Sequence, residues 1–332
     1  MIRTLNRESG IALVLTLWVI TILMVTATYF AYGRKWDSRV ASYYKESTFS
    51  YYLARSVITK TRILLSNEGE VAGHADFELI GGFLEIPREE LGGGYMGGTI
   101  TDLEARVNLN KAPLQLLRSL LINTGCEFEE AETIADCILD WRDDDSARRA
   151  NGAEDDDYLG LPNSYPCKDA PFDTLEELLL VQGMTDQIFY GDSTLAYRKD
   201  EPYDGNAIYL GLKDYLTVFG RGKVNVNTAE LVTLEAIPGV DEELARYIIN
   251  KREKQPEGFK NISEVTALLE QSGEGKENTR SIRSNLSVYS YYFLIEATGS
   301  IGVTETRIQT VIYRYGKNSR ILPRIVSWKE LS

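Results

Sequence analysis

An uncharged apolar segment near the amino terminus constrains this chain more than any other feature. It runs from Ile11 to Tyr32 without an Asp, Glu, Lys or Arg. A helix of this length can span the roughly 30 Å hydrocarbon core of a bilayer. Arg3 and Arg7 precede the segment, and basic residues on the amino-terminal side favour a cytoplasmic amino end. The sequence therefore predicts a single membrane-spanning helix, with the bulk of the chain on the opposite side of the membrane.

A secretory signal peptide is the main alternative for this segment. Its apolar region is about 7–15 residues long and ends at a small-residue cleavage site, whereas the run here is longer. Apolar residues at helical spacing continue after it, and no Pro or Gly interrupts the chain from Arg34 to Ser66. We therefore predict one continuous helix over 11–66, whose second half is amphipathic and packs against a soluble domain. An ordinary single-span anchor is the other interpretation of the same residues.

The charge balance and the scarcity of histidine limit the possible activities. The chain has 332 residues, a formal net charge of −13 and one histidine, His74, beside Gly73. Nucleic-acid binding needs an excess of Lys and Arg on one face. One histidine in a loop disfavours a Ser-His-Asp triad and a multi-histidine metal site. We therefore predict a protein that is not an enzyme and has no nucleic-acid partner.

Two stretches in the middle of the chain resemble each other. Residues 106–117 read Arg-Val-Asn-Leu-Asn-Lys-Ala-Pro-Leu-Gln-Leu-Leu, and residues 223–234 read Lys-Val-Asn-Val-Asn-Thr-Ala-Glu-Leu-Val-Thr-Leu. Asn110 and Asn227 are predicted to cap the helices that follow, because an Asn side-chain oxygen accepts from a free backbone N–H. Each copy continues with a second helix and a third related piece, at 129–142 and 172–178 in the first copy and at 242–252 and 259–265 in the second.

The second copy carries Ile-Pro-Gly-Val at 237–240, between its two helices. This hairpin resembles a helix-hairpin-helix element, which grips phosphate in DNA-binding proteins. A membrane-anchored DNA-uptake or DNA-binding protein is therefore the alternative function. Asp241, Glu242 and Glu243 follow at once, and acids there suit the helix dipole but repel phosphate. We favour a helical packing module.

An acidic insertion distinguishes the first copy from the second. Between its second helix and its third piece the first copy is 23 residues longer, and eight carboxylates lie between Asp140 and Asp157. Ca²⁺ takes 6–8 oxygen ligands from carboxylates and carbonyls on flexible loops. The loop suits calcium but is not an EF-hand, and a solvated acidic loop is the alternative. A glycosidase would need two carboxylates across a sugar-binding cleft, so crowding on one loop favours a cation.

The three cysteines, Cys126, Cys137 and Cys167, match no zinc-binding spacing. Cys126 and Cys137 lie at either end of a predicted helical stretch, roughly 15 Å apart, which is too far for a disulfide. If one bridge forms, Cys167 is therefore a member, with Cys137 or Cys126. A Cys137–Cys167 bridge would close the acidic loop across its base. Three buried thiols are the alternative.

Residues on both sides of the repeats have the composition of β-strands. We predict an antiparallel sheet from strands at 77–80, 83–86, 97–105, 287–297, 307–315 and 325–328. The predicted fold class is therefore α+β. A long amino-terminal helix packs on a sheet formed by 67–105 and 285–332, and an inserted all-α domain with two helix-hairpin-helix-like repeats occupies 106–284.

The amino terminus resembles the leader of type IV pilins and pseudopilins. In Glu-Ser-Gly-Ile-Ala-Leu at 8–13, the resemblance places cleavage by a prepilin peptidase between Gly10 and Ile11, with methylation of the new end. Most members carry Glu at the fifth mature position, where this chain has Leu15. With an apolar residue at this position, the chain resembles the protein-K minor pseudopilins of type II secretion systems. An apolar side chain needs no partner in the bilayer, whereas a carboxylate does.

Three internal motifs strengthen the resemblance to the protein-K family. They are Asp-Trp-Arg-Asp at 140–143, Asn-Gly-Ala-Glu-Asp at 151–155 and Ala-Pro-Phe-Asp-Thr-Leu-Glu-Glu-Leu at 170–178. The family binds structural Ca²⁺ in this inserted region. The resemblance thus implies a set of candidate ligands: Asp140, Asp143, Asp145, Glu154, Asp155 and Asp157.

The resemblance also implies a location and a set of partners. The anchor is expected in inner-membrane lipid, with the bulk of the chain in the periplasm. The chain is expected to join the minor pseudopilins I and J at the tip of the pseudopilus, in contact with the major pseudopilin and the inner-membrane assembly platform. Its expected role is structural, in protein export across the outer membrane.

Overall fold

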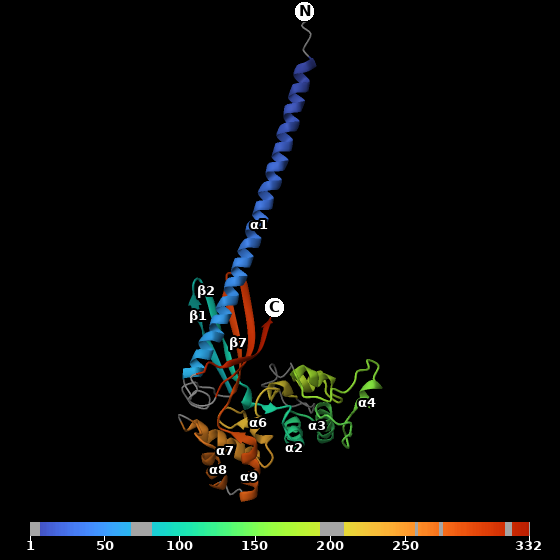
Figure 1. Cartoon of the computed structure of the whole chain (residues 1–332), viewed down its shortest axis with the longest axis vertical. Helices are drawn as coiled ribbons and strands as arrows, with labels where there is room; N and C mark the ends of the chain where they lie inside the picture. Colours follow the sequence, from blue (N-terminus) through green and yellow to red (C-terminus); the bar gives the residue numbers. More distant parts are fainter. Residues whose placement is uncertain are drawn as a thin grey trace, which may run out of the picture.

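The computed structural model describes residues 7–67, 82–192, 209–255, 258–271, 275–315 and 321–331. His74 and the predicted strand at 77–80 lie outside these residues. Figure 1 shows one very long helix, α1, that leads from the amino terminus onto a β-sheet, and a helical lobe beyond the far end of that sheet.

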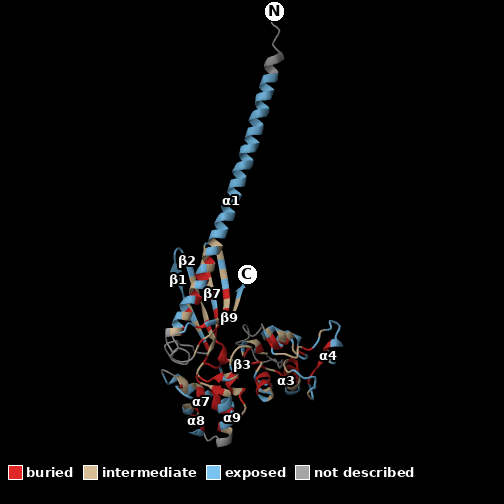
Figure 2. Cartoon of the chain, viewed as in Figure 1, coloured by how far each residue is buried: buried red, intermediate tan, exposed pale blue. Residues whose placement is uncertain are grey.

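Helix α1 is continuous from Arg7 to Asn67, which confirms the prediction of a single unbroken helix. From Ile11 to Lys45 the helix is exposed (pale blue in Figure 2), and its carboxyl-terminal part packs on the sheet. The buried apolar residues recur at helical spacing, as expected for a helix with one face against a core. They are Leu53, Ala54, Val57, Ile58 and Leu65.

In the described residues, five antiparallel strands form the sheet in the order β1-β2-β7-β8-β9. Their bounds are β1 Phe83–Leu91, β2 Gly94–Asp102, β7 Tyr292–Ile301, β8 Thr304–Tyr313 and β9 Arg324–Leu331. The central pairing joins the two parts of the chain that flank the repeats, with Ile100 opposite Ile295. Both side chains face α1 and, together with Ile308 and Ile312, form the core between the helix and the sheet. The α+β class is therefore confirmed.

Close contact between α1 and the sheet depends on a glycine. A Cβ at Gly299 of β7 would lie 2.0 Å from the carbonyl oxygen of Ser50 on α1. The hydroxyl groups of Ser50 and Thr306 are 2.7 Å apart, so a hydrogen bond also joins the helix to β8. The helix can lie this near the strands only because Gly299 has no side chain.

The helical lobe has a core of its own. Its α-helices are α2 Leu114–Asn123, α3 Phe128–Arg142, α4 Asp155–Leu159, α5 Asp186–Tyr190, α6 Leu231–Glu235, α7 Glu242–Glu253, α8 Ile262–Gln271 and α9 Lys276–Asn285. Its 3₁₀ turns are η2 Leu103–Ala105, η3 Leu175–Leu180 and η5 Leu212–Asp214. The predicted second helices of both copies are confirmed as α3 and α7. The third pieces differ from each other, since the first is the 3₁₀ turn η3 and the second is α8.

The lobe also contains two short parallel ladders that the sequence did not predict. Strand β3, Val107–Asn108, pairs with β4, Leu216–Thr217. Strand β5, Val224–Asn225, pairs with β6, Leu286–Ser287. Each copy therefore begins and ends on a two-residue strand, and this explains why the predicted strand over 287–297 is split between β6 and β7.

The prediction that Asn110 and Asn227 cap helices is wrong. Helix α2 begins after Pro113 and α6 after Glu230. Asn110 instead donates to the carbonyl of Phe172 at 2.9 Å and accepts from its N–H at 2.7 Å. Asn227 makes the same two bonds to Phe259, at 2.9 and 2.8 Å. Each Asn thus joins the first and third pieces of its copy, and the predicted internal repeat is present in the structure.

Candidate functional site

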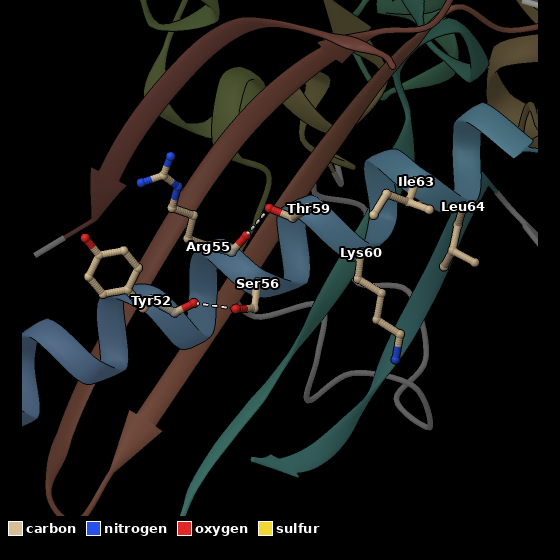
Figure 3. A pocket seen from close by; sticks show the side chains of 7 residues that line it. All are labelled: Tyr52, Arg55, Ser56, Thr59, Lys60, Ile63 and Leu64. Carbon is tan, nitrogen blue, oxygen red and sulfur yellow. Dashed lines mark hydrogen bonds between the residues drawn. The ribbon is translucent and has the colours of Figure 1, made fainter. Parts of the chain in front are cut away.

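The outer face of α1 over the sheet is an exposed surface of mixed character. Seven residues line a shallow pocket on this face, and Figure 3 shows their side chains on consecutive turns of the helix: Tyr52, Arg55, Ser56, Thr59, Lys60, Ile63 and Leu64. Tyr52, Ile63 and Leu64 are exposed although apolar. Lys60 pairs with Glu89 of β1 at 2.5 Å. We call these seven residues the outer α1 face.

The membrane segment forms the other exposed part of α1. The helix is long and apolar enough from Ile11 onward to cross a membrane, and that apolar part is not buried against the rest of the chain. Leu15 is 60% exposed. The backbone is helical through Gly10 and Ile11, the predicted cleavage position.

The acidic insertion begins where α3 ends, and its first carboxylate is fully buried. Asp140 is 0% exposed. Its Oδ1 pairs with Arg149 Nη1 at 2.5 Å, and its Oδ2 accepts from the backbone N–H of Arg149. Burial raises the pKa of Asp140, and these bonds to Arg149 oppose that rise. A Cβ at Gly152 would lie 1.8 Å from Asp140 Oδ2, so only glycine leaves room for this carboxylate.

Two more of the predicted ligands also have partners within the protein. Asp155 Oδ1 accepts from the N–H of Cys167 at 2.7 Å. Asp157 accepts from the N–H of Glu154 through Oδ2 and pairs with Arg148 through Oδ1, each at 3.1 Å. Asp140, Asp155 and Asp157 therefore shape the loop, and the structure does not bring them into a common group with the other candidates.

Asp143, Asp145 and Glu154 do converge. One carboxylate oxygen from each lies within 4.8 Å of the others. Asp143 Oδ2 is held by Arg149 Nη1 at 2.6 Å, whereas Asp143 Oδ1 and Glu154 Oε1 are buried without a hydrogen-bond partner among the described residues. Burial, followed by the negative charges of Asp140 and Asp169, raises the pKa of Glu154 to about 7. Three convergent carboxylates, two of which carry a buried oxygen without a partner among the described residues, fit a hard dication.

Sequence reasoning missed two residues next to this group. Cys167 and Asp169 each place a ligand atom within 4.8 Å of Glu154 and of each other. Asp169 Oδ1 is also buried without a partner among the described residues. Asp169 was missed because it lies 12 positions beyond the last predicted ligand, Asp157, outside the run of acids. Its place beside Glu154 arises from the return of the chain past α4.

All three cysteines are free and buried, which agrees with the alternative of three buried thiols, and the candidate Cys137–Cys167 bridge is not formed in the structure. The Sγ of Cys137 donates to the carbonyl of Asn151, and the Sγ of Cys167 donates to that of Asp140. Burial raises the pKa of each thiol to about 12. Cys137 on α3 thus bonds to the insertion, and Cys167 of the insertion bonds back to α3.

The hairpin of the second copy is shaped by acidic residues. Asp241 accepts from the N–H of Leu244 at 2.8 Å and caps α7, and Glu242 and Glu243 lie in its first turn. Gly239, at φ 91°, makes the turn before the helix. The helix start that would approach a phosphate is therefore occupied by carboxylates, which repel it.

A membrane-length exposed helix that continues onto an antiparallel sheet defines the class of this protein as a pilin-like, membrane-anchored assembly subunit, a pseudopilin. Two family models described as "Type II secretion system (T2SS), protein K" match residues 100–190 and 224–288. The matches cover both copies of the repeat. The chain belongs to the protein K family and is a minor pseudopilin of type II secretion.

Relatives and a solved structure agree with this assignment. Type II secretion system protein K of Klebsiella pneumoniae is 24% identical over 96% of both chains. Protein K of Pectobacterium carotovorum subsp. carotovorum is 25% identical over 70% of each. A chain in the crystal structure of the GspK-GspI-GspJ complex from the enterotoxigenic Escherichia coli type 2 secretion system matches with a TM-score of 0.67 at 20% identity, over 89% of this chain and 99% of that chain. This last likeness shows the fold. The comparisons give no support to the DNA-binding alternative.

Proposed function

We propose that this chain is the tip subunit of the pseudopilus and that it assembles there with the minor pseudopilins I and J, by analogy with the GspK-GspI-GspJ complex. The observation that carries the proposal is the position of the helical lobe. The lobe lies at the opposite end of the molecule from the amino terminus, beyond the sheet (Figure 1). Another subunit cannot stack beyond this bulk, so the chain has to come first in the filament. Its role in this proposal is structural, without catalysis.

The membrane segment supports the same position. A glutamate at the fifth mature residue would require a partner from the preceding subunit, since an unpaired carboxylate is costly in a bilayer. Leu15 requires none, which suits a subunit with nothing ahead of it. We propose that the anchor crosses the inner membrane once, with the amino end in the cytoplasm and the bulk of the chain in the periplasm. This periplasmic bulk includes the inserted domain at 106–284.

The outer α1 face is the surface that we assign to subunits I and J. Its apolar side chains lie on a helix that has the sheet on its other side, so a partner helix can pack on them. Co-purification of the full chain with the I and J homologues tests this assignment. Ile63→Asp should abolish capture, whereas Ile122→Asp, a matched exposed isoleucine on α2, should leave it intact. Absence of any complex with the unaltered chain contradicts the proposal.

The leader is the second element of the proposal. Prepilin peptidase is expected to cut between Gly10 and Ile11 before the chain joins the major pseudopilin and the inner-membrane platform. The intact mass of the chain from its native membrane reports the cut directly. A mass that starts at Ile11, with an added methyl group, supports the assignment, and an intact basic leader contradicts it.

Calcium is the third element. We propose that Asp143, Asp145 and Glu154 hold a structural Ca²⁺, with backbone carbonyls or water completing its oxygen shell. The ion would neutralise the carboxylates that crowd this loop and fix the insertion to the end of α3. Arg149 orients Asp143 from the other side, as outer-shell partners of metal ligands do.

A further inference from the structure

Helix α1 carries basic and aromatic side chains together where the membrane segment ends. The guanidinium carbon of Arg34 lies 4.8 Å from the centre of the Phe30 ring, and that of Arg39 lies 6.0 Å from the centre of the Trp36 ring. Both distances are within the range of a cation–π interaction. Lys35 lies between the two pairs, and all five side chains are exposed. We call these five residues the basic–aromatic belt.

Helix geometry directs the belt toward the bilayer. Each Cα–Cβ bond of an α-helix tilts toward the amino terminus, and the amino-terminal part of α1 is the membrane segment. Arg34 accordingly reaches four positions back to its ring, and Arg39 three positions back. From Ile11 to Tyr32 the helix is about 33 Å long, which matches a hydrocarbon core of about 30 Å. The belt therefore lies at the level of the lipid headgroups.

The charges of the belt are mostly of one sign. Between Gly33 and Val40 there are three basic residues and one acid, Asp37. Lys35 and Arg39 are four positions apart and share one face of the helix. Asp37 is two positions from each of them and lies on the opposite side of the helix. One face of α1 thus presents two cations to the headgroups without an acid between them.

These cations do not explain the orientation of the anchor. Basic residues favour the cytoplasmic side, whereas the belt is periplasmic in the topology proposed above. Cleavage after Gly10 would also remove Arg3 and Arg7, which leaves the belt as the basic part of the chain nearest the bilayer. The belt therefore contributes through another contact, and the complementary groups within its reach are anionic headgroups.

We propose that the basic–aromatic belt binds anionic phospholipid of the periplasmic leaflet, an inference that rests on the proposed topology. Arg34, Lys35 and Arg39 pair with the anionic headgroups, and a guanidinium can hold a phosphate through two parallel hydrogen bonds. The rings of Phe30 and Trp36 lie at the interface, where aromatic side chains are favoured. The contact fixes the depth of the anchor for as long as the helix stays in the bilayer.

Electron paramagnetic resonance with spin-labelled lipid tests the belt. The full chain is reconstituted in phosphatidylcholine vesicles that contain a trace of labelled phosphatidylglycerol or, in a separate sample, labelled phosphatidylcholine. The fraction of label with restricted motion gives the relative affinity of the chain for the two lipids. The unaltered chain should prefer phosphatidylglycerol several-fold, and concentrated salt should reduce this preference because it screens the charges.

Matched variants assign the preference to the belt. Lys35→Gln combined with Arg39→Gln should lower it by up to about fivefold for each charge removed. Arg55→Gln combined with Lys60→Gln is the control, since it removes the same charge from the same helix about 24 Å farther from the bilayer. Trp36→Leu, which keeps an apolar side chain but removes the ring beneath Arg39, should lower the preference by less than the double variant does.

Two results would overturn the proposal. One is equal affinity of the unaltered chain for the two labelled lipids, and the other is an equal preference in the double variant and the control. All variants share the same amino terminus, so the comparison holds whether or not the leader is cut. A chain that prefers phosphatidylglycerol but captures neither I nor J would support the belt and contradict the proposed tip complex.

Discussion

Arg142 and Arg252 occupy the same place in the two copies of the repeat and bond to the same two carbonyl positions. Arg252 Nη1 donates to Val226 and Ala229 at 2.9 and 2.6 Å. Arg142 makes the corresponding bonds to Leu109 and Ala112. Each guanidinium thereby ties the end of the second helix to the loop before the first. Burial lowers the pKa of both side chains, yet both remain cationic donors.

Replacement of Arg252 by Met tests the importance of this connection. Met keeps much of the stem but leaves two carbonyls without their donor, and a buried polar group that loses its partner costs about 1–3 kcal/mol. The thermal midpoint of the full chain in detergent should fall by about 2–4 °C for each kcal/mol. Arg246→Met, on the same helix but 59% exposed and paired with Glu242 one turn away, should change it little. Equal effects of the two variants would contradict this role.

The packing of α1 on the sheet gives a second prediction. Gly299→Ala should lower the thermal midpoint, because the new methyl group would overlap the Ser50 carbonyl and force α1 away from β7. Overpacking of this kind costs about 1–3 kcal/mol. Gly275→Ala is the control, since a Cβ there meets nothing within 4 Å. A Gly299→Ala chain as stable as the control would show that the helix can move away from the strand at little cost.

Local sequence patterns predicted the parts of this fold that depend on nearby residues. The periodicity of α1, α3 and α7 predicted the helices, and the alternation in β7 and β8 predicted the sheet. The likeness of residues 106–117 and 223–234 predicted the repeats. Asn110 was mistaken for a helix cap because its actual partner, Phe172, is 62 positions away. The break between β6 and β7 was missed for the same reason, since Ser290 bonds to Asp102 across 188 positions.

The candidate metal centre was predicted as a loop with six candidate ligands, of which the structure brings Asp143, Asp145 and Glu154 together. The density of acids identified the insertion, but composition does not tell which carboxylates are already paired. Asp140 and Asp157 bond to Arg149 and Arg148, within the same acidic run. Asp169 reaches Glu154 through the path of the chain around α4, and no local pattern encodes that approach.

The junction between sheet and lobe gives a pH-dependent prediction. Asp102 is fully buried at the end of β2, where Oδ2 accepts from Ser290, Thr228 and Asn225 at 2.6, 2.6 and 3.1 Å. Burial raises its pKa, and these hydrogen bonds oppose the rise. The folded chain therefore takes up this proton at a higher pH than the unfolded chain does. The stabilisation from protonation is complete below the usual Asp pKa of about 3.9 and is lost as pH rises through the folded value.

Asp102→Asn removes this titration. As pH falls from 7 toward 4, the thermal midpoint of the unaltered chain should rise relative to that of the variant. Thr228→Val removes one of the hydrogen bonds that hold the pKa of Asp102 down. In this variant the rise of the thermal midpoint should therefore begin at a higher pH. Thermal melts in matched buffers at constant salt measure both effects. Parallel pH profiles for all three chains would contradict the assignment.

Removal of calcium gives the last prediction. The carboxylates of Asp143, Asp145 and Glu154 repel one another in a partly buried loop, and a bound dication reverses that repulsion. A chelator should therefore lower the thermal midpoint of the full chain, and added Ca²⁺ should restore it, with a gain that grows with the ratio of free calcium to its dissociation constant. Asp145→Asn should reduce this response, whereas Asp144→Asn, the adjacent exposed residue with the same change of charge, should preserve it. Equal responses would mean that calcium acts through the general charge of the loop, and no response in the unaltered chain would exclude a structural ion.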